Sequence, residues 1–250
     1  IGDIVDKTES PTTFSPDNVK EVLDDIRKDK SVNNVLLYIN SGGGSVTASE
    51  KIRNMLVNFK KATGKTLTVS MNGLAASGAY WISTAADYVY ASPETITGSI
   101  GVFSLGISAD KLLNEYGVYE DGVETSELAR TSIAREMPQS QKIEIQLSVE
   151  SIYKKFITLA RNAHPELQKV DYREFAEGRI FTVYDAKNLH LINDIDTFDN
   201  LIANAKKQIE KDKNTICKVK HFVPDGIDSQ FILKRLLSTH IQGLVSDHTL

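Results

Sequence analysis

The chain has 250 residues, a formal net charge of −4 at pH 7, 41% hydrophobic residues and 25% charged residues. This balance is typical of a folded globular protein, and it excludes a disordered chain, a collagen-like repeat and a coiled coil. The mild negative charge argues against nucleic acid as a partner. The single cysteine, Cys217, excludes an internal disulfide and a cysteine zinc site, and we expect neither a metal nor a cofactor.

No stretch of the sequence reaches the length of a membrane span, which needs about 18 consecutive apolar residues. The chain also starts without a methionine, on Ile1-Gly2-Asp3-Ile4-Val5, as the middle of a longer sequence would. We therefore expect a soluble piece of a longer protein.

The first half of the chain alternates apolar runs with helical patterns. Ser15 followed by Pro16 predicts a helix start, and the apolar spacing carries that helix to Ile26. The apolar run 35–39 predicts a strand buried on both faces, and a helix ended by Gly64 follows it. Further strands are predicted over 67–71, 88–91 and 100–103. Strands that alternate with helices predict βαβ units and a mostly parallel sheet.

The second half of the chain is mainly helical. Residues 141–163 carry a long amphipathic pattern, and 185–212 predict two more helices. From residue 214 a strand-like patch leads to a last helix. We expect one domain over 1–212 and a carboxy-terminal extension, a strand plus a helix, over 213–250.

Three consecutive glycines, Gly42, Gly43 and Gly44, follow the predicted strand 35–39 and precede a helix. Glycine permits positive φ and lets the backbone approach a ligand closely. Backbone N–H groups at such a turn can bind an anion or a developing oxyanion. The spacing matches neither a P-loop nor a dinucleotide-binding fingerprint. A simple tight turn from strand to helix is an equally open interpretation.

Ser77 lies among small residues, in the segment 75–79, where a second strand leads into a helix. A nucleophile at this place gains from the helix dipole and from nearby amide donors. A helix cap without any chemistry is the simpler interpretation of Ser77 alone. A nucleophilic serine needs a base, and none of the histidines has a telling context. A buried lysine can replace histidine, but the sequence pattern singles out none.

Four segments in order resemble the signal peptide peptidase A (protease IV) family, the membrane-anchored Ser/Lys peptidases of bacteria and plastids. They are 40–46, 71–82, 97–102 and 178–192. The resemblance spans roughly residues 2–205. It implies an α/β chain with a ClpP/crotonase-like fold of stacked βαβ units, and a serine-bearing peptidase domain over 1–212. It also implies a serine endopeptidase that degrades cleaved signal peptides and other short or unfolded peptides.

The family's site residues carry over by position. Ser77 matches the nucleophile, the backbone amides of Gly44 and Gly78 match the oxyanion hole, and Ser99 matches the hydroxyl that orients the lysine amine. An amide-lined turn beside a hydroxyl is what acyl transfer needs. Apolar residues near Ser77 in the sequence could bind substrate, although core packing is the simpler role for each. They are Leu74, Tyr80 and Phe103.

The catalytic lysine of single-domain family members has no counterpart. Its position falls near Leu128, and no lysine occurs between Lys111 and Lys142. Arginine cannot replace it, because arginine stays protonated. In double-length members the amino-terminal domain supplies the lysine and the carboxy-terminal domain supplies the serine. We therefore expect this chain to be the carboxy-terminal half of such a protein, and to be inactive alone.

The resemblance also implies partners and a location. The partners are peptide substrates, the amino-terminal domain of the same protein and further copies in a homo-oligomer. The full-length protein is expected to be membrane-associated, with its catalytic part extracytoplasmic, on the periplasmic side in bacteria. Two other functions remain open, a non-catalytic scaffold domain of a peptidase assembly and a crotonase-type acyl-CoA enzyme. The absent lysine favours the scaffold, whereas Ser77 within a small-residue turn argues against the acyl-CoA enzyme.

Overall fold

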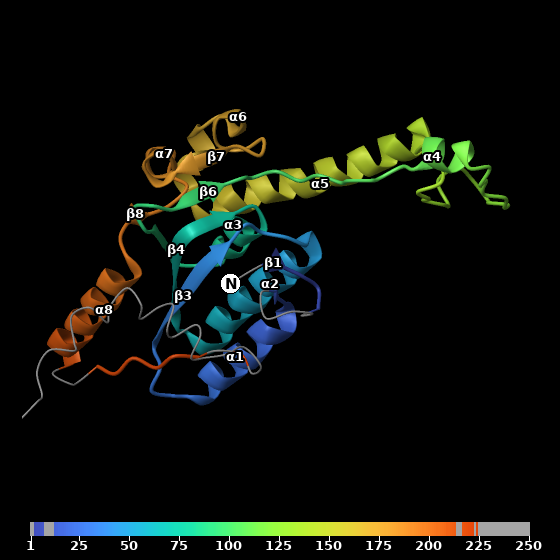
Figure 1. Cartoon of the computed structure of the whole chain (residues 1–250). Coiled ribbons are helices and arrows are strands. Elements are labelled where there is room, and N and C mark those ends of the chain that lie inside the picture. Colours follow the sequence, from blue (N-terminus) through green and yellow to red (C-terminus); the bar gives the residue numbers. More distant parts are fainter. Residues whose placement is uncertain (1–2, 8–12, 214–216, 223, 225–250) are drawn as a thin grey trace, which may run out of the picture.

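A six-stranded, mostly parallel sheet forms the centre of the molecule (Figure 1). This computed structural model describes residues 3–7, 13–213, 217–222 and 224. The strands of the sheet are β3 (Asn34–Ser41), β4 (Thr66–Ala76), β5 (Tyr88–Ala91), β6 (Ile96–Gly98), β7 (Ile180–Thr182) and β8 (Asp194–Ile195). β4 pairs in parallel with β3, β5 and β6, while β7 joins β6 antiparallel. The predicted α/β architecture with βαβ units is confirmed.

Two helices, α1 (Pro16–Lys28) and α2 (Val46–Thr63), begin and end where the sequence predicts. Asn18 Oδ1 accepts a hydrogen bond from the Ser15 N–H at 3.0 Å, which closes the start of α1. Gly64 ends α2 with φ +66°, a backbone conformation that costs glycine little. Figure 1 shows both helices on one side of the sheet and α8 (Phe198–Lys213) on the other.

Two strand predictions need correction. The strand predicted over 100–103 lies earlier, at Ile96–Gly98, because these residues pair with Leu74–Ala76 of β4. The chain then turns at Gly98 and Ser99, whose φ values of +91° and +51° end the strand. The run 35–38 is half-buried rather than fully buried: Leu37 packs against the core, and Tyr38, which points to the opposite face, contacts the Phe198 ring of α8.

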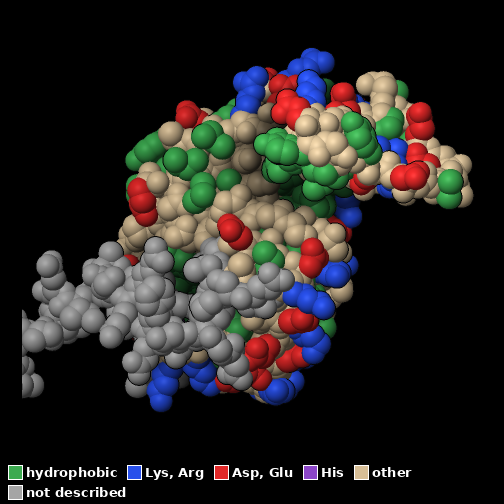
Figure 2. All heavy atoms as spheres, turned by 45° about the vertical axis from the view of Figure 1, so that its right-hand side comes forward, with side chains coloured by type: hydrophobic (Ala, Val, Ile, Leu, Met, Phe, Trp, Pro, Cys, Tyr) green, Lys and Arg blue, Asp and Glu red, His purple; other side chains and the backbone are tan. Residues whose placement is uncertain are grey.

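Residues 102–150 form a projecting arm. The chain runs out beside α5 (Gln139–Ala163), forms the short helix α4 (Asp110–Glu115) at the far end and returns along α5 (Figure 1). The inner part of α5 is packed into the core, where Phe156 is 1% exposed. Large apolar side chains of the arm are exposed, and Figure 2 shows such side chains gathered on the arm beside a hollow in the surface. They include Phe103, Leu105, Ile107, Tyr116, Tyr119, Val123 and Ile133.

A small lobe follows the arm and leads the chain back to the sheet. It contains a 3₁₀ turn (Pro165–Lys169) and the helices α6 (Tyr172–Phe175) and α7 (Val183–Asn188). The two helices predicted over 185–212 are therefore present as α7, which starts slightly earlier, and α8.

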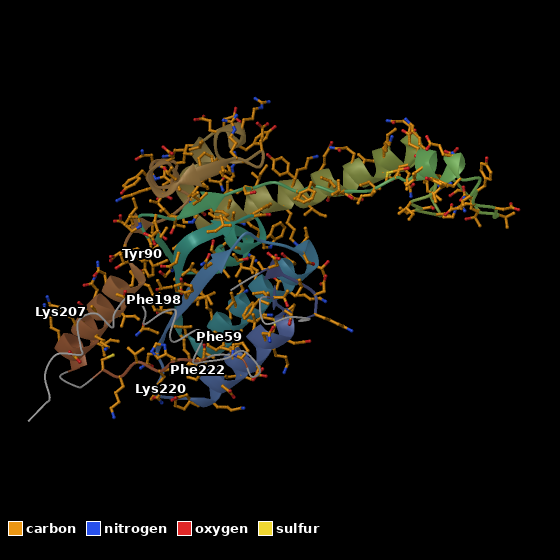
Figure 3. The ribbon with its side chains drawn as sticks, viewed as in Figure 1. Phe59, Tyr90, Phe198, Lys207, Lys220 and Phe222 are labelled. Atoms are coloured by element: carbon orange, nitrogen blue, oxygen red, sulfur yellow. The ribbon has the colours of Figure 1, made fainter. Side chains whose placement is uncertain are left out.

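The end of the described chain returns to α1. Lys220 donates a hydrogen bond to Asp29, and Phe222 packs against the core; both are labelled in the lower part of Figure 3. Residues 217–222 contain no strand, so the strand-like patch predicted there is wrong for these residues. The last predicted helix lies outside the described residues.

Candidate active site

Ser77 occupies a constrained turn between β4 and α3 (Gly78–Ser83). Its φ of 52° and ψ of −119° are rare for a residue with a side chain and cost about 1–3 kcal/mol. Two hydrogen bonds hold this backbone: the Ser77 N–H donates to the Gly98 carbonyl, and the Ser77 carbonyl accepts from the Trp81 N–H, both at 2.9 Å. In this described turn the side chain makes no capping bond with α3. The cap interpretation of Ser77 is therefore not supported by its geometry.

Gly44 and Gly78 come together beside Ser77, although they follow different strands. A Cβ built on Gly78 would lie 3.2 Å from the Gly44 nitrogen and would collide with Ser49 Oγ. A Cβ built on Gly43 would lie 2.7 Å from the Gly78 nitrogen and 2.9 Å from Ser77 Cβ. Only glycine fits such contacts, so the backbone amides lie next to the serine. As the first residue of α3, Gly78 also has no intrahelical acceptor for its N–H.

The short strand β1 (Asp3–Ile4) fixes the glycine turn from its other side. The Ile4 N–H donates to the Gly43 carbonyl at 2.9 Å, and the Ile4 carbonyl accepts from the Ser45 N–H at 2.8 Å. A Cβ on Gly44, where φ is +149°, would collide with the Ile4 carbonyl oxygen. The sequence shows Ile4 only as part of an apolar start, so this role could not be found there.

Ser99 lies directly after the residue that bonds Ser77. Its φ is +51°, and its N–H donates to the Arg179 carbonyl at 2.6 Å. The Gly178 N–H donates to the Ile100 carbonyl at 2.9 Å, so the segment around 178–180 supports the Ser99 turn from outside. One edge of the sheet thus brings together all four residues that the resemblance assigns to catalysis, Gly44, Ser77, Gly78 and Ser99.

Sequence comparisons give the family. The model of peptidase family S49 matches residues 59–212, and the Clp protease model matches residues 12–97. The chain belongs to peptidase family S49. The Clp protease match, together with the parallel α/β sheet, confirms the ClpP-like fold class.

Two relatives named Protease 4 are similar over most of this S49 chain. The protein from Salmonella typhi is 42% identical over 82% of the chain, and the one from Haemophilus influenzae is 33% identical over 97%. A chloroplastic serine protease SPPA from Arabidopsis thaliana is 29% identical over 75% of the chain. The S49 chain spans only 33% and 39% of the length of the two Protease 4 relatives and 28% of the chloroplastic one.

No hydrogen bond joins a lysine to Ser77 or Ser99 in the described part of the S49 chain. Two lysines on α2 and α5 form ion pairs with other residues: Lys60 Nζ lies 2.6 Å from an Asp87 oxygen, and Lys155 Nζ lies 2.8 Å from a Glu50 oxygen. Leu128, where a lysine was expected from single-domain members, is exposed on the projecting arm.

The residues suggested for substrate binding lie in three different environments. Tyr80 is 0% exposed and its hydroxyl donates to the Leu191 carbonyl at 2.9 Å, so it packs in the core and does not face a substrate. Burial raises the pKa of Tyr80 well above its usual range. Leu74 is 38% exposed and pairs with Ile96 of β6. Ile96 is exposed as well, and the sequence pattern did not single it out. Phe103 is exposed where the projecting arm begins.

Neither a metal centre nor a membrane span is found within the described ranges. No group of three or more His, Cys, Asp or Glu side chains there is placed to hold a metal ion. None of the described helices combines the length and the apolar character that crossing a membrane requires.

Proposed function

We propose that this chain is the serine-bearing domain of a serine endopeptidase with a Ser/Lys dyad. The observation that carries the proposal is the strained Ser77 backbone beside the amides of Gly44 and Gly78. Strain of this kind persists only where the surrounding structure over-determines it, and it concentrates at functional sites. The match to peptidase family S49 supports the same reaction class.

The chemistry follows from these positions. The Ser77 hydroxyl oxygen attacks the peptide carbonyl carbon while its proton passes to a neutral lysine amine. The oxyanion accepts hydrogen bonds from the Gly44 and Gly78 N–H groups, where each such donor is worth about 10²–10³ in kcat. The C–N bond then breaks, the lysine ammonium protonates the leaving amine, and water hydrolyses the acyl-enzyme. Ser99 orients the lysine amine.

The lysine comes from an amino-terminal domain of a longer protein of which this chain is the carboxy-terminal half. Two facts support this: no lysine occurs between Lys111 and Lys142, and the chain covers about a third of its Protease 4 relatives. The isolated chain is then inactive. In the full-length protein a membrane anchor holds the catalytic part on the extracytoplasmic side.

The substrates are cleaved signal peptides and other short or unfolded peptides with apolar side chains. Leu74, Ile96 and Phe103 are exposed apolar residues on β4, on β6 and at the start of the arm, and they supply the contacting surface. The exposed apolar side chains of the projecting arm support a homo-oligomer, because large apolar side chains gathered on a surface mark association surfaces.

The experiment is active-site labelling of the full-length protein with a fluorophosphonate, followed by peptide mass spectrometry. The expected result is one covalent adduct, on Ser77. An adduct on another serine, or none, would contradict the assignment of the nucleophile.

A second candidate, a non-catalytic scaffold domain, is favoured only by the absent lysine. On that view Ser77 has no chemical role, and its replacement leaves peptide hydrolysis by the full-length protein unchanged.

A further inference from the structure

Glu50, on α2, connects three helices through one carboxylate. Its Oε2 accepts a hydrogen bond from the Trp81 Nε1–H of α3 at 2.9 Å. Its Oε1 accepts from the Lys155 ammonium of α5 at 2.8 Å and from the Asn54 amide of its own helix at 2.9 Å. The Lys155 nitrogen also lies 6.0 Å from the centre of the Trp81 ring. Both oxygens of Glu50 are therefore engaged.

The Glu50–Trp81 bond lies one helical turn from the proposed nucleophile. Trp81 is four residues after Ser77, and its backbone N–H bonds the Ser77 carbonyl. On the neighbouring helix, Ser49 Oγ is the closest atom to the position that a Cβ on Gly78 would occupy. Ser49 Oγ in turn donates to the Ser45 carbonyl at 2.8 Å, at the start of α2. The Glu50–Trp81 hydrogen bond therefore connects α2, which follows Gly44, to α3, which begins at Gly78.

The Glu50 carboxylate is partly buried, and its hydrogen-bond donors keep it ionised. The Glu50 side chain is 24% exposed, and Trp81 is 2% exposed, so the indole N–H has little access to water and needs a protein acceptor. Burial raises the pKa of Glu50, but hydrogen bonds from Lys155, Asn54 and Trp81 outweigh it, and the pKa falls below its usual value. Glu50 thus stays ionised at neutral pH and keeps two acceptor oxygens.

We propose that Glu50 is a positioning residue of the peptidase reaction: by holding Trp81, it fixes the Ser77–Gly78 turn of α3 against the Gly44 turn that precedes α2. This rests on the function proposed above. A displacement of about 1 Å in such a constellation can cost about a hundredfold in rate. Lys155 extends the same link to α5, the helix that runs into the projecting arm.

The test is steady-state peptide hydrolysis by the full-length protein with Glu50→Ala and Glu50→Gln. We expect Glu50→Ala to lower kcat about tenfold to a hundredfold, with KM changed less than about twofold. Glu50→Gln should lose less, since its one carbonyl oxygen can still accept from Trp81. The matched control is Asp24→Asn on α1, a carboxylate that likewise accepts hydrogen bonds through both oxygens, here from Lys20 at 2.9 Å and Arg27 at 2.8 Å. This control should keep full kcat.

A second measurement separates positioning from general stability. Trp81 is the single tryptophan of the chain, so its emission spectrum in the 250-residue chain reports the Glu50 bond directly. We expect Glu50→Ala to shift that emission while the far-UV circular dichroism stays unchanged, and Asp24→Asn to shift neither. If Glu50→Ala loses its helical signal, the near-isosteric Glu50→Gln decides in its place.

The outcomes separate this inference from the proposed function. A shifted emission with wild-type kcat in both Glu50 variants overturns the positioning role, while Ser77 keeps its own. Unchanged hydrolysis by a Ser77→Ala variant overturns the proposed function itself, whatever the Glu50 variants do.

Discussion

The candidate active site and the projecting arm differ in how far contacts within this chain hold or cover their residues. At the site, the backbone of Ser77, Gly44 and Gly78 is fixed from several sides by contacts within this chain. On the arm, Val123 and Phe103 are among many large apolar side chains that no described part of the chain covers. The proposed nucleophile and oxyanion-hole residues are therefore held by this chain alone, whereas the proposal assigns the lysine and the cover of the arm to other domains or chains.

The largest effect is expected at Ser77. Replacing it with alanine in the full-length protein should lower kcat by about 10³-fold or more, because no other group can form the acyl-enzyme. Ser148→Ala, on the exposed side of α5, is the matched control and should keep full activity. Peptide hydrolysis measures both. Retained activity in Ser77→Ala would favour the scaffold function.

The next effect is expected at the glycine turn. Gly44→Ala forces a methyl group against the Ile4 carbonyl oxygen, so the amide must move. Loss of one oxyanion donor should cost about 10²–10³ in kcat. Gly64→Ala provides the comparison, since Gly64 also has positive φ but nothing lies within 4 Å of its Cβ position. It should lower stability by about 1 kcal/mol and leave kcat unchanged. Equal activity of the two variants would remove Gly44 from the site.

A smaller effect is expected on the projecting arm, where substitutions should weaken self-association. Tyr116→Asp and Val123→Asp place charges on side chains that are 78% and 104% exposed in the single chain. Burial of such a side chain in an interface is worth about 1.5–3 kcal/mol, so each change should weaken self-association of the full-length protein at least about tenfold. Sedimentation velocity measures this. An unchanged oligomer would show that the arm is not the association surface.

The last expected effect is a pH dependence of stability where α5 meets the small lobe. His164, at the inner end of α5, is 4% exposed, and burial lowers its pKa to about 4. The folded state therefore disfavours the charged form: His164 contributes fully above about pH 6.5 and loses this contribution as pH falls toward 4. We expect the chain to lose about 2 kcal/mol of unfolding free energy between pH 7 and pH 4.5 through this group.

Urea unfolding of the chain and of His164→Gln at both pH values measures that contribution. The variant should show a smaller loss between pH 7 and pH 4.5 than the unmodified chain. An identical pH dependence in the two would exclude His164 as the responsible group.

Local patterns in the sequence were sufficient for the longer described helices and for β3, β4 and β5, while β7, β8 and the short helices α4 and α6 were not predicted. Ser15 and Gly64 identify helix ends because their signals lie within a few residues. The strand at Ile96–Gly98 was predicted too late in the chain. Its position depends on pairing with β4 and on the turn at Ser99, which the residues of the strand alone do not reveal. Tyr80 was assigned a possible substrate contact because sequence proximity to Ser77 does not reveal burial.

The site was partly predictable. Gly44, Ser77, Gly78 and Ser99 were found through motifs, and their roles stay predictions. Ile4 and Glu50 were missed because their contacts with Gly43 and Trp81 join segments about 30 or more residues apart, and nothing in their own sequence surroundings signals them.

The central claim is that this chain holds the serine but receives its lysine from another domain. The most direct measurement is the rate of fluorophosphonate labelling at Ser77 in the isolated 250-residue chain and in the full-length protein. The proposal predicts rapid labelling of the full-length protein and labelling of the isolated chain slower by about a hundredfold or more. Equal rates would contradict it, because Ser77 would then be activated by a base within this chain.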